Sequence, residues 1–187
     1  MENTSTTLSY GPISCSLDLE SPGKRFGNMS LNHSSHRHAF STIPIPIAVI
    51  KGGDGPTVLL SAGNHGDEYE GQCILRRAIR ELDAADINGR LIILPAFNAP
   101  AVSAARRTSP LDEGNLNRSF PGDPDAGPTK AIAGFVVTHL FPMTDFCLDF
   151  HSGGSTSTYV NCGYLSVGTS AELHRRNVEL IEAFGAP

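Results

Sequence analysis

The sequence predicts an α/β protein built on a mostly parallel, mixed sheet with helices on both faces. Two patterns predict this class. One is a set of short apolar segments typical of buried strands, and the other is a set of amphipathic segments of helical period that alternate with them. A third observation is size, since 187 residues that are 40% hydrophobic can enclose a sizeable core. The chain ends directly after a predicted helix, so we expect the sheet to be incomplete at the C-terminus.

Residues 1–42 are predicted to form an N-terminal strand and a polar arm. The segment "ISCSLDL" (13–19) alternates well enough for one strand. A later segment, "SLNHSSHRHAFST", is polar and holds three close histidines, His33, His36 and His38. A metal site is one interpretation of these histidines, but no further signal supports it. A solvated loop or a packing arm is the better interpretation.

From Ile43 onward the pattern becomes regular. The segment "IPIPIAVIKGG" is predicted to be an edge strand, because its prolines cannot donate hydrogen bonds to a central ladder. The next segment, "TVLLSAG", is short and continuously apolar, which is typical of a strand buried on both faces. The remaining expected elements are helices at about 68–82, 128–140 and 171–184 and buried strands at 89–97 and 146–152.

Composition limits the partners and the compartment. The net charge is −5, from 14 basic and 19 acidic residues without a basic cluster, so we expect no nucleic-acid partner. No apolar segment approaches the about 20 residues needed to cross a bilayer, so we expect no membrane partner. The four cysteines form no CxxC pair and the N-terminus lacks the features of a secretory signal, which together favour the cytoplasm.

Polar side chains follow the predicted strands at the points where the strands end. His65 and Glu68 come after "TVLLSAGN", and side chains three residues apart on a first helical turn lie on the same face. His151 ends the segment "FCLDFH" and precedes "SGG". Ligands of an open parallel sheet bind outside the carboxyl ends of its strands, so these groups should meet. Two histidines and one glutamate, with a fourth position open, are a known catalytic zinc set.

A long loop follows the strand "RLIILPAF" and is rich in turn residues. Its sequence is "APAVSAARRTSPLDEGNLNRSFPG", and it holds Arg106, Arg107, Asn115, Asn117 and Arg118. A guanidinium group can bind a carboxylate through two parallel hydrogen bonds. The loop is therefore a candidate for binding the carboxylate of a substrate.

Each of these features also has a plainer interpretation. A His and a Glu three apart occur by chance on many helix starts, and a lone histidine at a strand end is commonly structural. Arg118 could form a surface ion pair, and the other arginines could simply hold the loop in place. Asp149 should point to the same side of its strand as His151, either to steady that histidine or as a buried structural carboxylate. All three polar groups nevertheless occupy equivalent strand ends, and chance does not favour that coincidence.

Three motifs, "GNHGDEYEG", "DEGNLNRSFPG" and "LDFHSGG", resemble in order and spacing those of the succinylglutamate desuccinylase/aspartoacylase family. The fold of that family is that of the zinc carboxypeptidases. Because the resemblance runs from about Ile43 to the end, it implies that residues 43–187 are the N-terminal part of a zinc hydrolase catalytic domain. It also implies that His65, Glu68 and His151 hold one Zn²⁺ per chain.

The same resemblance implies roles for the long loop. Asn117 and Arg118 match an Asn-Arg pair that grips the substrate carboxylate in this family. An upstream arginine of the family helps to polarise the scissile carbonyl. Arg106 and Arg107 are both candidates, and Arg107 is preferred because of its position before "SP".

The last part of the chain departs from the family pattern. Family members use a glutamate well downstream of the last zinc ligand to activate water, and they carry a C-terminal β-rich region. Only three glutamates follow the last ligand here, and all lie on the predicted last helix: Glu172, Glu179 and Glu182. Glu70 should point along its helix, away from the ligands. We therefore expect the general base and the β-rich region to be absent, and the chain to be an N-terminal portion.

The resulting hypothesis is a zinc-dependent amidohydrolase that removes the acyl group from a small N-acyl amino acid. Within the family, the chain is most similar to the branch that includes N-acetyl-diaminobutyrate deacetylase of ectoine breakdown. One alternative is a metallocarboxypeptidase that acts on small peptides, and another is a zinc-binding but catalytically inactive fragment. A homo-oligomer is a further possibility.

Overall fold

The structure is a computed structural model that describes residues 6–36, 38–167 and 170–185. The chain divides into two compact units, residues 1–156 and 157–187. The first unit holds the sheet, and the second holds the helix α4 (Ala171–Phe184). Each unit is described by itself. None of the helices in the described residues is long and apolar enough to span a membrane.

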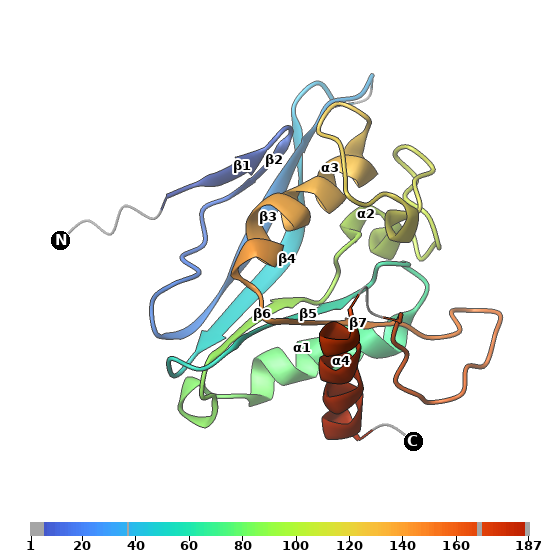
Figure 1. The fold of residues 1–187 in the computed structure, drawn as a ribbon. Coiled ribbons are helices and arrows are strands. Elements are labelled where there is room, and N and C mark those ends of the chain that lie inside the picture. The colour runs from blue at the N-terminus through green and yellow to red at the C-terminus, as the bar shows by residue number, and fades with distance from the viewer. Residues whose placement is uncertain (1–5, 37, 168–169, 186–187) are drawn as a thin grey trace. The chain divides into compact units, whose positions relative to one another are not determined.

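Seven strands of the first unit form one mixed sheet in the order β1-β2-β3-β4-β6-β5-β7 (Figure 1). β5 pairs in parallel with both β6 and β7, and all other neighbours are antiparallel. The α/β prediction with a mixed sheet is thus confirmed, although its parallel part is limited to three strands. The strands are β1 (Leu8–Tyr10), β2 (Ile13–Cys15), β3 (Gly23–His33), β4 (Ser41–Lys51), β5 (Thr57–Ala62), β6 (Arg90–Leu94) and β7 (Phe146–Phe150).

The prediction that the proline-containing segment is an edge strand is wrong, because β4 lies between β3 and β6. β6 pairs only with residues 48–51 of β4, so the half that contains Pro44 and Pro46 pairs with β3 alone. The prolines are tolerated because that half has no second neighbour among the described strands. A long strand such as β4 can therefore lie inside the sheet and still contain prolines, because they lie in the half that pairs on one side only.

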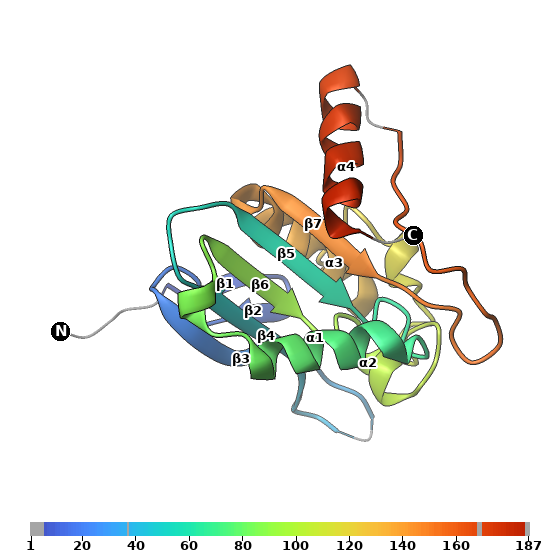
Figure 2. The same cartoon turned by 90° about the horizontal axis from the view of Figure 1, so that it is seen from below.

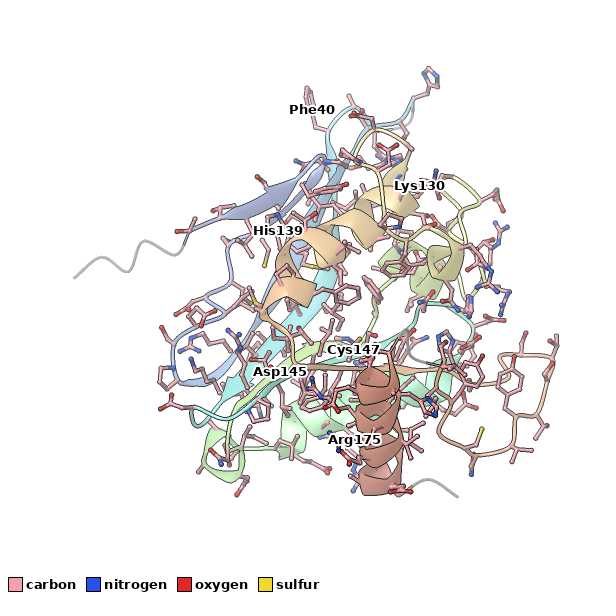
Figure 3. All side chains as sticks on the ribbon, in the orientation of Figure 1. Phe40, Lys130, His139, Asp145, Cys147 and Arg175 are labelled. Carbon is pink, nitrogen blue, oxygen red and sulfur yellow. The ribbon has the colours of Figure 1, made fainter. Side chains whose placement is uncertain are left out.

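The polar segment of residues 30–42 is strand at its two ends, in β3 up to His33 and in β4 from Ser41, and the described residues between them are not strand. It closes the hairpin of β3 and β4, and only the connection between these strands lies outside the ladder. Phe40 projects from this connection fully exposed (Figure 3). Residues 8–33 thus extend the same sheet that carries β4, and the proposed boundary at residue 42 falls within a hairpin.

Helices cover both faces of the sheet, as predicted. Helix α1 lies against one face and α3 against the other, and the two views agree on this arrangement (Figures 1 and 2). The larger core cluster includes the α3 residues Ile132 and Phe135, and the smaller one includes Leu75 of α1. The helical elements of the first unit are α1 (Tyr69–Glu81), α2 (Ala99–Ser103), α3 (Pro128–Phe135), the 3-10 helices η1 (Ala84–Asp86), η2 (Leu116–Arg118) and η4 (Phe141–Met143), and the π-helix η3 (Val136–Leu140).

Candidate metal and substrate site

The parallel strands β6, β5 and β7 end at one edge of the sheet, and the loops that follow them meet there. The loop after β5 begins at Gly63, whose φ of +72° favours glycine. A Cβ at Gly63 would lie 2.8 Å from Val102 of α2, so the turn also packs too closely for a side chain. The backbone N–H of Asn98 donates to the carbonyl of Gly63 at 3.0 Å. These contacts hold the loops after β5 and β6 against each other.

His65, Glu68 and His151 come together at this edge. One potential ligand atom from each residue lies within 4.8 Å of the others. Glu68 is the centre of the group, because its Oε1 lies 2.7 Å from His65 Nδ1 and its Oε2 lies 2.8 Å from His151 Nδ1. His65 and Glu68 are only 2% and 3% exposed. A loop after β5 and a strand end 83 residues later thus form one polar group, in which His65 and Glu68 are buried and His151 is exposed.

Each imidazole has an acceptor for its other nitrogen. His65 Nε2 lies 3.3 Å from Asn115 Oδ1, and His151 Nε2 lies 2.8 Å from Asp149 Oδ2. With the hydrogen on Nε2, each imidazole donates to an oxygen there, and the lone pair of its Nδ1 then faces the Glu68 carboxylate. Such partners fix the tautomer and orientation of histidines that bind metals.

This donor arrangement fits a divalent cation. Two nitrogen lone pairs and a carboxylate within 3 Å repel one another unless a proton or a cation lies between them. The backbone N–H of Ser152 also donates to Glu68 Oε2 at 3.0 Å and so fixes the carboxylate in place. Two imidazole nitrogens and one carboxylate oxygen are a three-ligand set that leaves a fourth position open. The residues present are therefore able to hold a metal ion.

Asp149 contacts His151 as expected, and it is not a buried structural carboxylate, because its side chain is 29% exposed. Ser61 donates to its Oδ1 at 2.7 Å, and Asn64 donates to its Oδ2 at 3.1 Å. The hydrogen bond that His151 donates to Asp149 is the main reason that the pKa of His151 is raised to about 9, and it outweighs the opposing effect of burial. Without a metal, His151 would therefore hold a proton at neutral pH.

The structure brings Arg107 to the same group. Its Nη1 lies 3.4 Å from both His65 Nδ1 and Glu68 Oε1, while 54% of its side chain stays exposed. Arg106 instead pairs with Glu113 at 2.7 Å. Of the two candidate arginines, Arg107 is thus the one beside the histidine–carboxylate group.

Asn117 and Arg118 lie in η2, and both are exposed. Arg118 Nη1 donates to the carbonyl oxygen of Asn117 at 3.0 Å. Within the described residues, neither side chain contacts the three candidate ligands. The loop that carries them is tied to the group through Asn115, which follows the same strand and reaches His65. Their role in binding substrate remains a prediction.

The carboxylates near the group have different partners. Glu70 accepts a hydrogen bond from the hydroxyl of Ser152, the residue that follows His151. This hydrogen bond lowers the pKa of Glu70. In α4, Glu172 and Glu179 both pair with Arg175 of the same helix.

Among the described residues, His65, Glu68 and His151 are the one group of side chains that could hold a metal ion. The histidines of the β3–β4 hairpin form no such group.

Sequence reasoning did not assign roles to Asn115 and Ser152. Asn115 was noted only as a loop residue, although it faces His65, and Ser152 contacts Glu68 through its backbone. A backbone donor has no signature in the side-chain sequence. Asn115 could have been suspected, because a metal-binding histidine usually donates the N–H of its second ring nitrogen to a nearby oxygen.

Comparison with known proteins shows which sequences and structures this chain resembles. Residues 54–187 match the sequence profile of the "Succinylglutamate desuccinylase/Aspartoacylase catalytic domain". The N-alpha-acetyl-L-2,4-diaminobutyric acid deacetylase of Halomonas elongata is 48% identical over 176 residues, which are 94% of this chain and 52% of that protein.

Solved structures with similar descriptions also superpose on this chain. A succinylglutamate desuccinylase from Silicibacter sp. TM1040 superposes with a TM-score of 0.91 at 42% identity, covering 96% of this chain and 54% of that one. The product-bound ectoine utilization protein EutE (DoeB) from Ruegeria pomeroyi superposes with a TM-score of 0.90 at 44% identity, covering 96% and 55%. The chain thus spans about half the length of the relatives that it matches.

Proposed function

The chain belongs to the succinylglutamate desuccinylase/aspartoacylase family, and we propose that its protein is a zinc-dependent amidohydrolase. The proposed substrate is a small N-acyl amino acid, with N-acetyl-diaminobutyrate of ectoine breakdown as the best candidate. Support comes from the deacetylase of Halomonas elongata and from EutE, which its description calls an ectoine utilization protein. Because the chain covers only half of these relatives, the activity is proposed for the whole protein.

One observation carries the proposal. The Nδ1 atoms of His65 and His151 lie 2.7 and 2.8 Å from the two oxygens of one buried carboxylate, that of Glu68. Since each imidazole donates its Nε2–H to another acceptor, both Nδ1 atoms are prepared to bind a cation. Nitrogen and carboxylate ligands in this number suit Zn²⁺ with an open position. When bound, zinc supplies Lewis acidity that polarises a carbonyl and activates water at neutral pH.

The chain's own residues would bind and orient the substrate. Arg107 is beside the proposed ligands, so its exposed guanidinium could donate to the acyl carbonyl oxygen as negative charge develops there. We assign Asn117 and Arg118 to the α-carboxylate of the substrate, because they lie exposed on the same loop and offer amide and guanidinium donors. The general base is proposed to come from sequence outside this chain, as family members carry it well downstream of their last ligand.

Two alternatives remain open. A metallocarboxypeptidase would need the same metal and the same carboxylate grip, and it would hydrolyse short peptides rather than acetylated amino acids. A zinc-binding but inactive chain would bind zinc and ligand without turnover. Comparing these two substrate classes in the whole protein, and in this chain alone, separates the three possibilities.

The metal assignment can be tested by the zinc content of the purified chain, beside His151→Ala. We expect about one zinc per chain in the wild type and almost none in the variant, because His151 provides one of three ligands. His36→Ala is the matched control, since His36 is exposed in the β3–β4 connection. It should keep the zinc.

Two results would contradict the assignment. A folded wild-type chain that contains no zinc would contradict the assignment of His65, Glu68 and His151 as zinc ligands. Zinc lost in the His36→Ala control but kept in His151→Ala would instead locate the metal at the histidines of the β3–β4 hairpin.

A further inference from the structure

Buried polar atoms without a partner gather at the carboxyl ends of β5 and β6. Four such side-chain atoms occur in the described residues, and one of them is His174 Nδ1 in α4. The other three are oxygens that follow β5 or β6: Asn64 Oδ1, Asp67 Oδ1 and Asn98 Oδ1. A buried oxygen without a donor is costly, and in a native protein it calls for an explanation such as a ligand.

Asp67 is the charged member of this set. Its Oδ1 is buried without a partner, and no hydrogen bond or ion pair to its carboxylate occurs among the described residues. The carboxylate lies against Gly154, in the loop that follows His151. A Cβ at Gly154 would lie 2.8 Å from Asp67 Oδ2, and the φ of Gly154 is +62°. The glycine therefore leaves room for a carboxylate that nothing in the described chain neutralises.

Neighbouring carboxylates all have partners. Glu68 lies between two histidines, Glu70 accepts from Ser152, and Asp149 accepts from Ser61, Asn64 and His151. Glu113, in the long loop, pairs with Arg106. Asp67 is thus the unmatched negative charge beside the candidate metal group, one residue from Glu68 and two from His65.

The chemistry of the relative's substrate supplies the missing cation. N-alpha-acetyl-L-2,4-diaminobutyric acid, named for the Halomonas elongata enzyme, has an acetylated α-nitrogen and a free amine at carbon 4. That amine is an ammonium ion at neutral pH, because its pKa resembles that of lysine. The molecule therefore carries a carboxylate for the arginines and a cation that no arginine can bind.

We propose that Asp67 determines specificity by binding the side-chain ammonium group of a diamino acid substrate. This inference rests on the proposed function, because it assumes that the amino acid binds beside His65, Glu68 and His151. A charge-assisted hydrogen bond to a partly buried carboxylate is worth about tenfold or more in affinity. The plainer alternative is that Asp67 only stabilises the N-terminus of α1, which its position before Tyr69 would allow.

The test compares two ligands that differ only in the ammonium group. L-2,4-diaminobutyrate and L-2-aminobutyrate are titrated separately into the zinc-loaded chain and its Asp67→Asn variant, and the dissociation constants are measured by calorimetry. We expect the wild type to prefer diaminobutyrate by about tenfold or more. Asp67→Asn should bind both ligands about equally, with its affinity for aminobutyrate unchanged. Glu70→Gln is the matched control, because it removes an equal charge three residues away and should keep the preference.

A second readout needs no variant. The backbone amide signal of Gly154 should shift with diaminobutyrate and stay nearly still with aminobutyrate. A preference kept in Asp67→Asn, or absent in the wild type, overturns the inference while the proposed function stands. If the whole protein, loaded with zinc, binds neither amino acid, the proposed function fails and the inference fails with it. A loss of thermal stability without a change in preference would assign Asp67 to the helix end.

Discussion

The two ends of the parallel strands treat buried polar groups in opposite ways. At the amino end, Arg90 is 7% exposed, and its guanidinium finds an acceptor for each of its nitrogens. These acceptors are Thr57 Oγ1 at 3.1 Å, the carbonyl of Leu19 at 3.0 Å, Glu20 Oε1 at 2.6 Å and the carbonyl of Met143 at 3.4 Å. At the carboxyl end, Asn64, Asp67 and Asn98 each keep a buried oxygen without a partner.

The comparison distinguishes buried polar groups that stabilise the fold from buried polar groups that are available to bind a ligand. A buried cation whose donors are all used contributes to folding, because removing it would leave several acceptors unsatisfied. A buried polar group that stays unsatisfied destabilises the folded chain, and a ligand that completes it would explain why it is there. The amino end should therefore govern stability, and the carboxyl end should govern binding.

Arg90→Met should have the largest effect. We expect a loss of about 3 kcal/mol in the free energy of unfolding, because buried acceptors from three segments lose their donor. Urea unfolding monitored by circular dichroism measures it, and the zinc content of the folded fraction should not change. Arg77→Met is the control, since Arg77 pairs with Glu81 on an exposed helix surface and should matter little. Equal losses in the two variants would refute the structural role given to the amino end.

Asp149→Asn should act on zinc rather than on folding. The variant loses the carboxylate that orients His151, so zinc affinity should fall by about 10–100-fold with little change in unfolding. Asp145→Asn at the start of the same strand is the matched control, because Asp145 accepts the N–H of Thr57 at 2.8 Å, at the amino end. It should lower stability and leave zinc affinity intact. If Asp149→Asn lowered stability and Asp145→Asn lowered zinc affinity, the proposed difference between the two ends would be wrong.

The pH dependence of zinc binding follows from the raised pKa of His151. Because that pKa is about 9 in the metal-free chain, the imidazole is protonated below it and zinc must displace the proton. Zinc affinity should therefore rise with pH between 6 and 8, by about tenfold per unit for this one proton. In Asp149→Asn the pKa should return toward its ordinary value of 6.5, so the rise should level off near neutral pH. A flat wild-type profile would contradict this.

Asp112→Asn should have the smallest effect. The Asp112 carboxylate accepts from Thr129 N at 2.8 Å and Thr129 Oγ1 at 2.6 Å, which ties the long loop to the start of α3. Burial raises the pKa of Asp112, but these bonds and one from Gly114 outweigh it, so the pKa is lowered overall. The contribution of Asp112 to folding stability is therefore fully present when the pH is above the ordinary pKa of the carboxyl. It is lost as the pH falls through the lowered pKa of the folded chain. We expect a loss of about 1 kcal/mol at pH 7, as for a helix cap.

The control for this variant is Asp125→Asn, a matched change at an exposed position shortly before α3. Unfolding at pH 7 and at pH 3 should show the difference between the wild type and Asp112→Asn shrinking in acid. A difference that stays constant with pH would show that the carboxylate charge is not involved.

The regular part of the fold could be predicted because its signals are local. Continuous apolar segments at β5, β6 and β7 and the helical stripes of α1, α3 and α4 are properties of a few neighbouring residues. The position of β4 could not be predicted, because prolines report which backbone donors are missing and not which strands lie beside them. The ladder of β3 was missed for another reason, because its polar residues alternate with the buried Met29 and Leu31 and face the unpacked side of an antiparallel pair.

The candidate site divides in a similar way. The sequence by itself determined which residue types follow the strands, and the topology of parallel strands implies that His65, Glu68 and His151 meet. Only the tertiary structure decided that both imidazoles present Nδ1 to one carboxylate, that Arg107 rather than Arg106 is beside them, and that Asp67 lacks a partner. The physical reason is range. Strand and helix signals act over a few residues, whereas tautomer, ion pairing and unsatisfied burial depend on atoms that the chain brings together from distant segments.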